Sequence, residues 1–334
     1  MMIIEIKDYD NQIAFNNLQV FLDKKAIEYQ ILKHKQKIYF CLSGYYQVDD
    51  FFLSDQYLLK DEAASYYFVS KKYQDQTIIT DYNLTIGGHD LIIIGGPCSV
   101  ESSQQMERIC SYLHKSATNC LRGGIFKPRT SPYAFQGLKG KGLQIIKEVA
   151  TKYHYPIVCE LTSLAQVEKY AKDIDIIQIG ARNMQNYELL KAVAQTQKPI
   201  ILKRGFTATI NELLCAAEYI FVAGNPKIIL CERGIRTFED AYRNVTDINA
   251  IVLLKQLTHL PVIIDPSHAT GSANLVERVA LSAITAGCDG LLVETHYDPE
   301  NALSDGAQSL DEQQYLSLIT KANDLKKYLI SKGM

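Results

Sequence analysis

The chain has 334 residues, more than one ordinary hydrophobic core usually holds, so we expect a large barrel or a barrel with an additional domain. Hydrophobic residues make up 47% and charged residues 22% of the chain, which is typical of a soluble globular protein. The formal net charge of -2 gives no general attraction to nucleic acid or to a membrane surface, so any anion-binding site must be local.

The N-terminal sequence carries Glu5, Lys7 and Asp8 and lacks the apolar core and the cleavage site of a secretory signal. No apolar run reaches the length of a membrane span. Eight cysteines without such a signal indicate free thiols in a reducing cytoplasm. Because no CxxC pair occurs, a structural zinc site is not expected.

Residues 1–70 have the pattern of a small ferredoxin-like α+β domain. We predict strands at 3–6, 27–32, 38–42 and 66–69, and helices at 13–22 and, less regularly, 48–57. This domain holds no group of histidine, cysteine and carboxylate side chains that could carry out catalysis. Residues 71–84 are predicted to form a linker and the start of a hairpin, which continues to Gly88 and could plug the bottom of a barrel.

Strands alternating with helices are predicted for residues 85–334. The apolar runs lie at 91–94, 120–126, 156–161, 174–179, 199–202, 227–230, 261–264 and 290–293. Each is followed by a stretch with helical period, for example 104–113 and 210–221. Eight such units predict a (β/α)8 TIM barrel, with a doubly wound open sheet as the alternative.

Cations follow several of these strands, at the barrel end where active sites lie. The second strand is followed by Arg122, Lys127 and Arg129, with Pro128 in the turn and the hydroxyls of Thr130 and Ser131 beside them. The later strand ends add Arg182, Lys203 and Arg233. So many cations indicate two anionic substrates, or a phosphate and a carboxylate. A solvated basic turn, or structural ion pairs, is the alternative.

Potential metal ligands follow the first, seventh and eighth strands, which are neighbours in a closed barrel. They are Cys98, His268, Glu294 and Asp305. A thiol, an imidazole and two carboxylates suit one divalent ion, namely manganese, iron, cobalt or zinc. Taken singly, Cys98 would be a buried apolar residue and His268 a structural histidine.

Seven motifs together resemble the type I 3-deoxy-D-arabino-heptulosonate 7-phosphate (DAHP) synthases. They are GGPCSVE (95–101), FKPRTS (126–131), QIGARN (178–183), LKRG (202–205), CERGIR (231–236), DPSH (265–268) and LSDG (303–306). The resemblance covers residues 85–325. The order of the N-terminal elements is similar to that of the short branch of this family, in which a ferredoxin-like regulatory domain precedes the barrel.

The resemblance implies condensation of phosphoenolpyruvate with erythrose 4-phosphate, the first step of the shikimate pathway to aromatic amino acids. It implies that Cys98, His268, Glu294 and Asp305 bind the metal, and that phosphoenolpyruvate is held by Arg122, Lys127, Arg182, Lys203 and Arg233 with the backbone of Gly180 and Ala181. Arg129 and Thr130, with Pro128 shaping the turn, would bind the phosphate of the sugar. Catalysis would involve Lys127, Cys98 and His268, with Lys127 the best candidate for proton transfer.

The same resemblance suggests a cytoplasmic homotetramer with an aromatic amino acid as the effector of the N-terminal domain. One alternative is 3-deoxy-D-manno-octulosonate 8-phosphate synthase, which has an alanine-asparagine-arginine type of sequence in place of the run at 127–131. A second is a Schiff-base aldolase with Lys203 as the nucleophile. A third is a sugar-phosphate sensor without activity.

Overall fold

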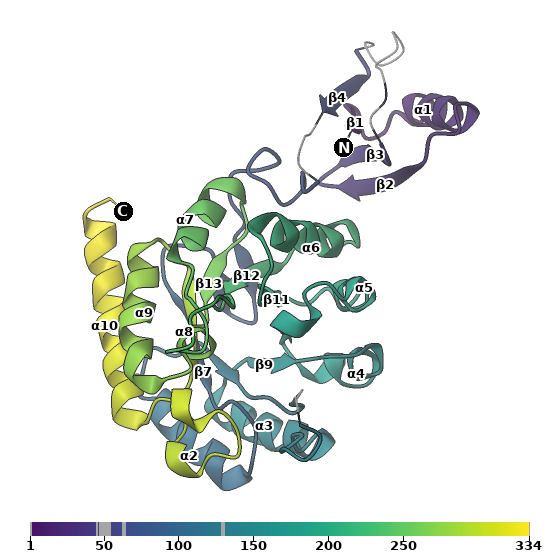
Figure 1. Ribbon diagram of the computed structural model, residues 1–334. Coiled ribbons are helices and arrows are strands. Elements are labelled where there is room, and N and C mark those ends of the chain that lie inside the picture. The colour runs from purple at the N-terminus through teal and green to yellow at the C-terminus, as the bar shows by residue number, and fades with distance from the viewer. Residues whose placement is uncertain (1, 45, 47–54, 62–64, 128–130, 334) are drawn as a thin grey trace. The chain divides into compact units, whose positions relative to one another are not determined.

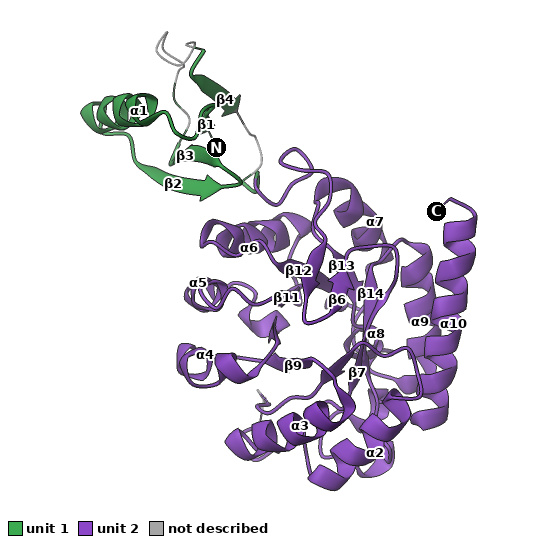
Figure 2. Ribbon diagram, turned by 180° about the vertical axis from the view of Figure 1, so that it is seen from behind, with its two compact units in different colours: residues 1–67 green, residues 68–334 purple. Residues whose placement is uncertain are grey.

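A computed structural model describes residues 2–44, 46, 55–61, 65–127 and 131–333 of the chain (Figure 1). The chain divides into two compact units, Met1–Tyr67 and Phe68–Met334 (Figure 2). The elements of the first unit are β1 (Met2–Ile6), α1 (Gln12–Lys24), β2 (Tyr29–His34), β3 (Lys37–Leu42) and β4 (Tyr57–Asp61).

The first unit is an antiparallel sheet with one described helix. The strand order β2-β3-β1-β4 is that of a ferredoxin-like domain. Helix α1 begins after Asn11, whose side chain accepts a hydrogen bond from the backbone N–H of Ala14 at 2.9 Å. The helix buries Leu18 and Leu22 in a common core with alternate residues of β1, such as Ile4. This unit therefore has a hydrophobic core of its own.

Two predictions for this unit need comment. The expected strand at 66–69 is wrong: the fourth strand is β4, and Phe68 instead stacks on Phe221 of the second unit with ring centroids 5.7 Å apart. The backbone N–H groups of Phe68 and Val69 donate to the Glu218 carboxylate, each at 3.0 Å, so they are satisfied outside any sheet. The helix expected at 48–57 lies mostly outside the described residues, and Tyr57 begins β4.

The second unit is a closed barrel of eight parallel strands in the order β7 to β14, as the sequence predicted. The strands are β7 (Ile92–Gly96), β8 (Cys120–Arg122), β9 (Ile157–Glu160), β10 (Ile176–Ile179), β11 (Ile200–Lys203), β12 (Ile228–Glu232), β13 (Val262–Ile264) and β14 (Gly290–Glu294). Each is buried along nearly its whole length, which is why the runs read as continuous apolar residues.

Helices surround the barrel on its outside (Figure 1). They are α2 (Ser103–Leu113), α3 (Gly140–Tyr153), α4 (Leu164–Tyr170), α5 (Tyr187–Ala194), α6 (Ile210–Val222), α7 (Ile248–Leu257), α8 (Pro266–Thr270), α9 (Ala273–Thr285) and α10 (Glu312–Ser331). Helix α6 begins at a capping box in which Thr209 and Glu212 exchange hydrogen bonds. Helix α8 is short, follows β13 directly and carries His268.

The hairpin of β5 (Ile79–Asp81) and β6 (Leu84–Ile86) closes the barrel at the amino ends of its strands. Ile79, Leu84 and Ile86 belong to the same core cluster as inward-facing residues of the barrel strands, such as Ile92 and Ile263. Because this end is plugged by apolar side chains, access to the barrel interior is confined to the carboxyl ends of the strands.

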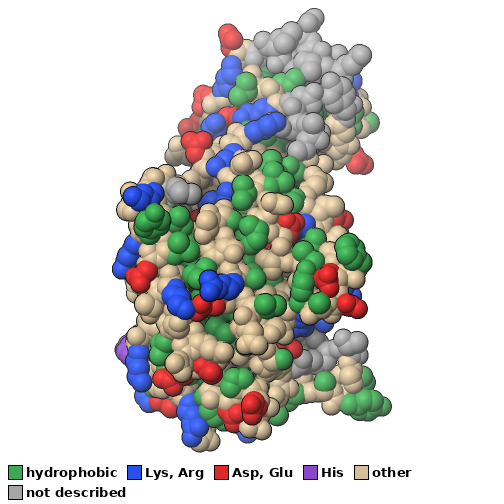
Figure 3. Space-filling view, turned by 60° about the vertical axis from the view of Figure 1, so that its left-hand side comes forward, with side chains coloured by type: hydrophobic (Ala, Val, Ile, Leu, Met, Phe, Trp, Pro, Cys, Tyr) green, Lys and Arg blue, Asp and Glu red, His purple; other side chains and the backbone are tan. Residues whose placement is uncertain are grey.

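The face of the molecule drawn in Figure 3 carries both signs of charge interspersed, without a broad patch of one sign. Among the helices of the described ranges, none combines the length and the apolar character needed to cross a membrane.

We predict a pH-dependent contribution to stability from Glu218, which is buried on α6. Burial raises the pKa of this carboxyl from 4.5 to about 7, and the hydrogen bonds from Phe68 and Val69 oppose that rise. The folded state therefore keeps the proton that the unfolded state loses near pH 4.5, so the free energy of unfolding should fall as the pH rises from about 5 to 7. The contribution is on the order of 1 to 3 kcal/mol.

Urea unfolding of the wild type and of Glu218→Gln at pH 5, 6, 7 and 8 measures this contribution. The difference in unfolding free energy between the two proteins should change across this range and level off above about pH 7. Glu148→Gln, which replaces an exposed carboxyl on α3, serves as the control and should show no such change. A constant difference for Glu218→Gln would contradict the prediction.

Candidate active site

A cavity of about 300 Å³ opens at the carboxyl ends of the barrel strands. Of the residues singled out from the sequence, it is lined by Arg122, Lys127, Ser131, Gly180, Ala181, Arg182, Lys203, Arg233, His268 and Asp305. Its wall also includes Ala134, Glu160, Gln178, Phe206 and Arg243. Pro128, Arg129 and Thr130, which were expected to bind the second phosphate, lie outside the described residues.

The strand ends supply most of the cations of this cavity. Arg122 is the last residue of β8, Lys203 is the last residue of β11, and Arg233 directly follows β12. All three are nearly fully buried, with 3% to 4% of their surface exposed. Arg122 and Lys203 are paired with the carboxylates of Glu294 and Asp265. Because the wall of the cavity nevertheless carries more cations than carboxylates, it favours an anionic ligand.

Gly180 brings the backbone close to the wall of the cavity. A Cβ atom at this position would lie 2.0 Å from Oε1 of Glu160, which is the last residue of β9. Only glycine therefore leaves room for the Glu160 carboxylate, and Ala181 begins a short 3₁₀ turn immediately afterwards. This turn places Arg182 at the cavity.

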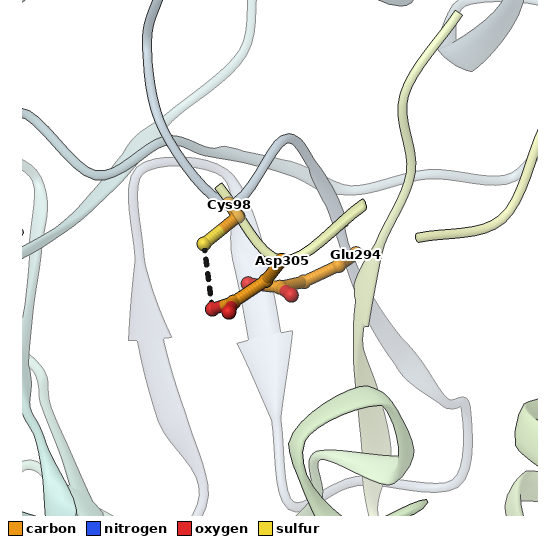
Figure 4. Close-up of side chains that lie close together, drawn as sticks. All are labelled: Cys98, Glu294 and Asp305. Carbon is orange, nitrogen blue, oxygen red and sulfur yellow. Dashed lines mark hydrogen bonds between the residues drawn. The ribbon is translucent and has the colours of Figure 1, made fainter. Parts of the chain in front are cut away.

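A possible metal centre lies at the same end of the barrel. Ligand atoms of Cys98, Glu294 and Asp305 all lie within 4.8 Å of one another (Figure 4). The Cys98 thiol donates a hydrogen bond to Oδ2 of Asp305 at 3.1 Å. Nε2 of His268 lies 3.5 Å from Oε1 of Glu294 and 3.9 Å from Oδ2 of Asp305. Cys98, Glu294 and Asp305 thus come together after β7 and β14, and His268, which follows β13, lies beside the two carboxylates.

The hydrogen bonds of His268 leave a lone pair facing these carboxylates. Its Nδ1 lies 2.7 Å from Oδ2 of Asp265, and since burial, opposed by nearby carboxylates, lowers the pKa of His268, we treat the ring as neutral. Nδ1 then donates to Asp265, and Nε2 carries an unshared electron pair. An imidazole lone pair and two carboxylates facing one another favour a cation between them, so the residues fit a divalent metal.

The charge of Glu294 is maintained by its neighbours. Burial alone would raise the pKa of this carboxyl, but the protonated form of His268, together with Arg122 and Lys127, holds it well below its usual range, and the two cationic side chains act also when the ring is neutral. Nη1 of Arg122 lies 2.6 Å from Oε1 of Glu294, and Gln308 donates to Oε2. Arg122 therefore contacts one of the predicted metal ligands and also lines the anion cavity, so the two groups of side chains adjoin.

Lys127 also joins the two halves of the site. Its Nζ donates to Sγ of Cys98 at 2.8 Å and to the Cys98 carbonyl at 3.1 Å. Burial and then the Glu294 carboxylate raise the pKa of the Cys98 thiol to about 12, although Lys127 opposes this. Without a bound cation the thiol stays protonated at neutral pH, and a divalent metal would favour the thiolate.

Sequence reasoning gave no role to Asp265, which organises the centre of the site. The carboxylate is fully buried and forms an ion pair with Lys203 as well as the hydrogen bond with His268. Burial would raise the pKa of Asp265, but His268 and Lys203 hold it well below its usual range. The sequence does contain a feature that could have indicated this role, because Asp265 lies three residues before His268 and metal-binding histidines usually donate to a carboxylate. In the structure Asp265 also caps α8.

Arg243 and Phe206 are two further residues that the sequence did not single out. Nη1 of Arg243 lies 3.8 Å from Oδ1 of Asp305 and donates to Gln308. Arg243 therefore links the cavity wall to one of the predicted metal ligands. Phe206 follows β11 and contacts guanidinium groups by its ring. Neither carries a motif signal, since both lie in irregular loops.

Known proteins are similar to this chain over most of its length. The sequence model described as the DAHP synthetase I family matches residues 70–330. A phospho-2-dehydro-3-deoxyheptonate aldolase of Thermotoga maritima is 46% identical over 261 residues, covering 78% of this chain and 77% of that protein. A 2-dehydro-3-deoxyphosphooctonate aldolase of Desulfotalea psychrophila is 32% identical over 254 residues, covering 70% and 89%.

Two solved structures of Thermotoga maritima proteins are also similar to this chain. The crystal structure of the phospho-2-dehydro-3-deoxyheptonate aldolase (DAHP synthase) of Thermotoga maritima matches with a TM-score of 0.79 and 40% identity, covering 98% of each chain. A truncated form of 3-deoxy-D-arabino-heptulosonate 7-phosphate synthase from the same organism matches with a TM-score of 0.75 and 43% identity, covering 80% of this chain and 98% of that one.

Proposed function

Because the chain belongs to the DAHP synthetase I family, a family of enzymes, we propose that it condenses phosphoenolpyruvate with erythrose 4-phosphate to give 3-deoxy-D-arabino-heptulosonate 7-phosphate and phosphate. The observation that carries this proposal is the cation-lined cavity beside the cluster of Cys98, Glu294 and Asp305. One mouth of the barrel thus offers sites for a strongly anionic substrate and for a divalent metal.

Phosphoenolpyruvate carries a carboxylate and a phosphate, which matches the cations of the cavity. We assign its binding to Arg122, Lys127, Arg182, Lys203 and Arg233, with the backbone of Gly180 and Ala181. The fork of an arginine suits both anionic groups, and the cations would also stabilise the phosphate as it leaves. Pro128, Arg129 and Thr130 remain our candidates for the phosphate of the sugar.

In the reaction, C3 of phosphoenolpyruvate attacks the aldehyde carbon of the sugar, so a C–C bond forms and the aldehyde oxygen takes up a proton. Water then adds to C2, the bond between C2 and the phosphate oxygen breaks, and phosphate leaves as the ketone forms. Lys127 is our candidate for the proton transfer, because it lines the anion cavity and its Nζ donates to Sγ of Cys98. A divalent metal held by Cys98, His268, Glu294 and Asp305 would polarise the aldehyde oxygen as a Lewis acid.

The environment of Lys203 does not favour the Schiff-base alternative. Nζ of Lys203 forms a buried ion pair with Asp265. In an ion pair the amine carries a proton and has no lone pair with which to attack a carbonyl carbon. Binding and charge stabilisation are the roles that this environment favours for Lys203.

The test is a phosphate-release assay with phosphoenolpyruvate and either erythrose 4-phosphate or arabinose 5-phosphate, with protein that is metal-stripped or reloaded with manganese. We expect release with erythrose 4-phosphate and metal, at least about tenfold slower release with arabinose 5-phosphate, and almost none after chelation. A preference for arabinose 5-phosphate would indicate the octulosonate synthase instead. Borohydride trapping of substrate on Lys203 would indicate a Schiff-base aldolase. If neither sugar gave phosphate release, the sugar-phosphate sensor without activity would be the alternative that remains.

We further propose a regulatory role for the first unit, in a cytoplasmic homotetramer. Its separate core and its ferredoxin-like sheet support binding of an aromatic amino acid that controls the barrel. A chain lacking residues 1–67, which leaves the contacts of Phe68 with the barrel in place, should lose inhibition by tyrosine or phenylalanine and keep its activity. Unchanged inhibition of the shortened chain would refute this role.

A further inference from the structure

The ring of Phe206 lies among three guanidinium groups at the mouth of the barrel. The Cζ atoms of Arg233 and Arg236 each lie 4.8 Å from the ring centroid, and that of Arg182 lies 5.4 Å away. All three distances are within the range of cation–π attraction, which extends to about 6 Å. Phe206 follows β11, whereas the arginines follow β10 and β12, its two neighbours in the barrel.

Arg182 and Arg233 line the anion cavity together with Phe206. Arg233 is buried, and its guanidinium donates to two backbone carbonyls, those of Gly234 at 3.4 Å and His268 at 3.2 Å. None of the ion pairs of the described residues includes this guanidinium, so the electron-rich face of the ring acts together with the more distant carboxylates of Asp265 and Glu232 in offsetting its charge.

The third arginine is tied to the same ring through the backbone. The N–H of Arg236 donates to the carbonyl of Phe206 at 2.7 Å, so the loop after β12 is fixed to the loop after β11. This bond fixes the backbone of Arg236 beside Phe206, and the exposed side chain of Arg236 adds a further positive charge next to the ring. Like charges repel, and the attraction of the ring for each guanidinium offsets part of the repulsion among the three.

We propose that Phe206 is a positioning residue that holds Arg182 and Arg233 in a fixed pair for the anionic groups of phosphoenolpyruvate, with Arg236 as the outer cation of the array. This inference rests on the proposed function. The ring does not touch the reacting atoms in this account, and it acts through the two arginines. It lowers the cost of binding by ordering them before the substrate arrives.

Phe206→Leu tests the proposal, because leucine keeps an apolar side chain and removes the π face. In the full-length, metal-loaded protein we expect the KM for phosphoenolpyruvate to rise about tenfold, with kcat and the KM for erythrose 4-phosphate each within about twofold of the wild type. Phe206→Tyr, which retains an aromatic ring, should restore the wild-type KM. A KM for phosphoenolpyruvate that stays within twofold in Phe206→Leu would overturn the proposal.

A double-mutant cycle separates positioning from general packing. If the ring acts through Arg182, then Phe206→Leu should raise the KM for phosphoenolpyruvate much less when Arg182→Ala is already present. Equal increases in both backgrounds would show that the ring does not act through this arginine. Thermal unfolding of each variant measures any loss of stability, and Phe206→Met provides a second apolar replacement should the leucine variant fold poorly.

Calorimetric binding of phosphoenolpyruvate without the sugar keeps this test distinct from that of the proposed function. A wild type that binds phosphoenolpyruvate and forms no product with either sugar would refute the function, while weaker binding by Phe206→Leu would still support the positioning role. Conversely, an active wild type with equal binding by wild type and Phe206→Leu would refute the positioning role alone.

Discussion

Replacing Cys98 with alanine is expected to abolish metal binding and, with it, product formation. The thiol lies within 4.8 Å of the ligand atoms of Glu294 and Asp305, so its removal takes one ligand from the cluster. Loss of an outer partner of a metal ligand typically costs roughly 10- to 100-fold in affinity, and loss of a ligand itself should cost at least as much. We therefore expect kcat/KM at limiting metal to fall by at least about a hundredfold.

The matched control is Cys288→Ala. Cys288 is also fully buried, but it precedes β14 and so lies at the opposite end of that strand from Glu294. This variant should bind manganese like the wild type, as measured by equilibrium dialysis, and should keep its activity. If Cys98→Ala bound the metal as tightly as Cys288→Ala, the assignment of the Cys98 thiol as a metal ligand would be wrong.

Replacing Asp265 with asparagine is expected to reduce both stability and activity. The change leaves the ammonium of Lys203 buried without its counter-charge and weakens the hydrogen bond that orients His268. Breaking a buried ion pair from one side costs about 3 to 5 kcal/mol. We expect a loss of free energy of unfolding near the lower end of this range, measured in urea, and a drop in metal affinity of roughly 10- to 100-fold.

Asp289→Asn distinguishes the two effects. Asp289 is another buried carboxylate paired with a lysine, Lys255 at 2.7 Å, and it accepts a hydrogen bond from Val262 at the amino end of β13. This variant should also lose stability but should bind manganese normally. Equal metal affinity in Asp265→Asn and Asp289→Asn would mean that Asp265 serves only the fold.

The sequence predicted the barrel and the main residues of its mouth for one physical reason. Parallel strands covered on both faces are continuous apolar runs, and the residue after each run lies at the same barrel end. Cys98, Arg122, Lys203, Arg233 and Glu294 could therefore be placed on a common rim without knowledge of any contact. The four predicted metal ligands could be grouped because the first and last strands of a closed barrel are neighbours, and these two strands do pair in the structure.

The failures concern residues whose role depends on partners distant in sequence. The run 66–69 has the composition of a strand, but the backbone N–H groups of Phe68 and Val69 donate to the carboxylate of Glu218, about 150 residues away. Phe206 and Arg243 lie in loops whose positions no periodicity predicts. Asp265 directly follows a predicted strand, but its role depends on its contacts with Lys203 and His268, which only the folded structure shows.

Anomalous diffraction from crystals of the manganese-loaded protein soaked with phosphoenolpyruvate tests the central claim most directly. We predict a manganese peak bounded by Cys98, His268, Glu294 and Asp305, with the phosphate and the carboxylate of phosphoenolpyruvate on the cations of the same cavity, including Lys203 and Arg233. A manganese peak elsewhere, or phosphoenolpyruvate bound outside this cavity, would contradict the claim that the metal and the anionic substrate share one mouth of the barrel.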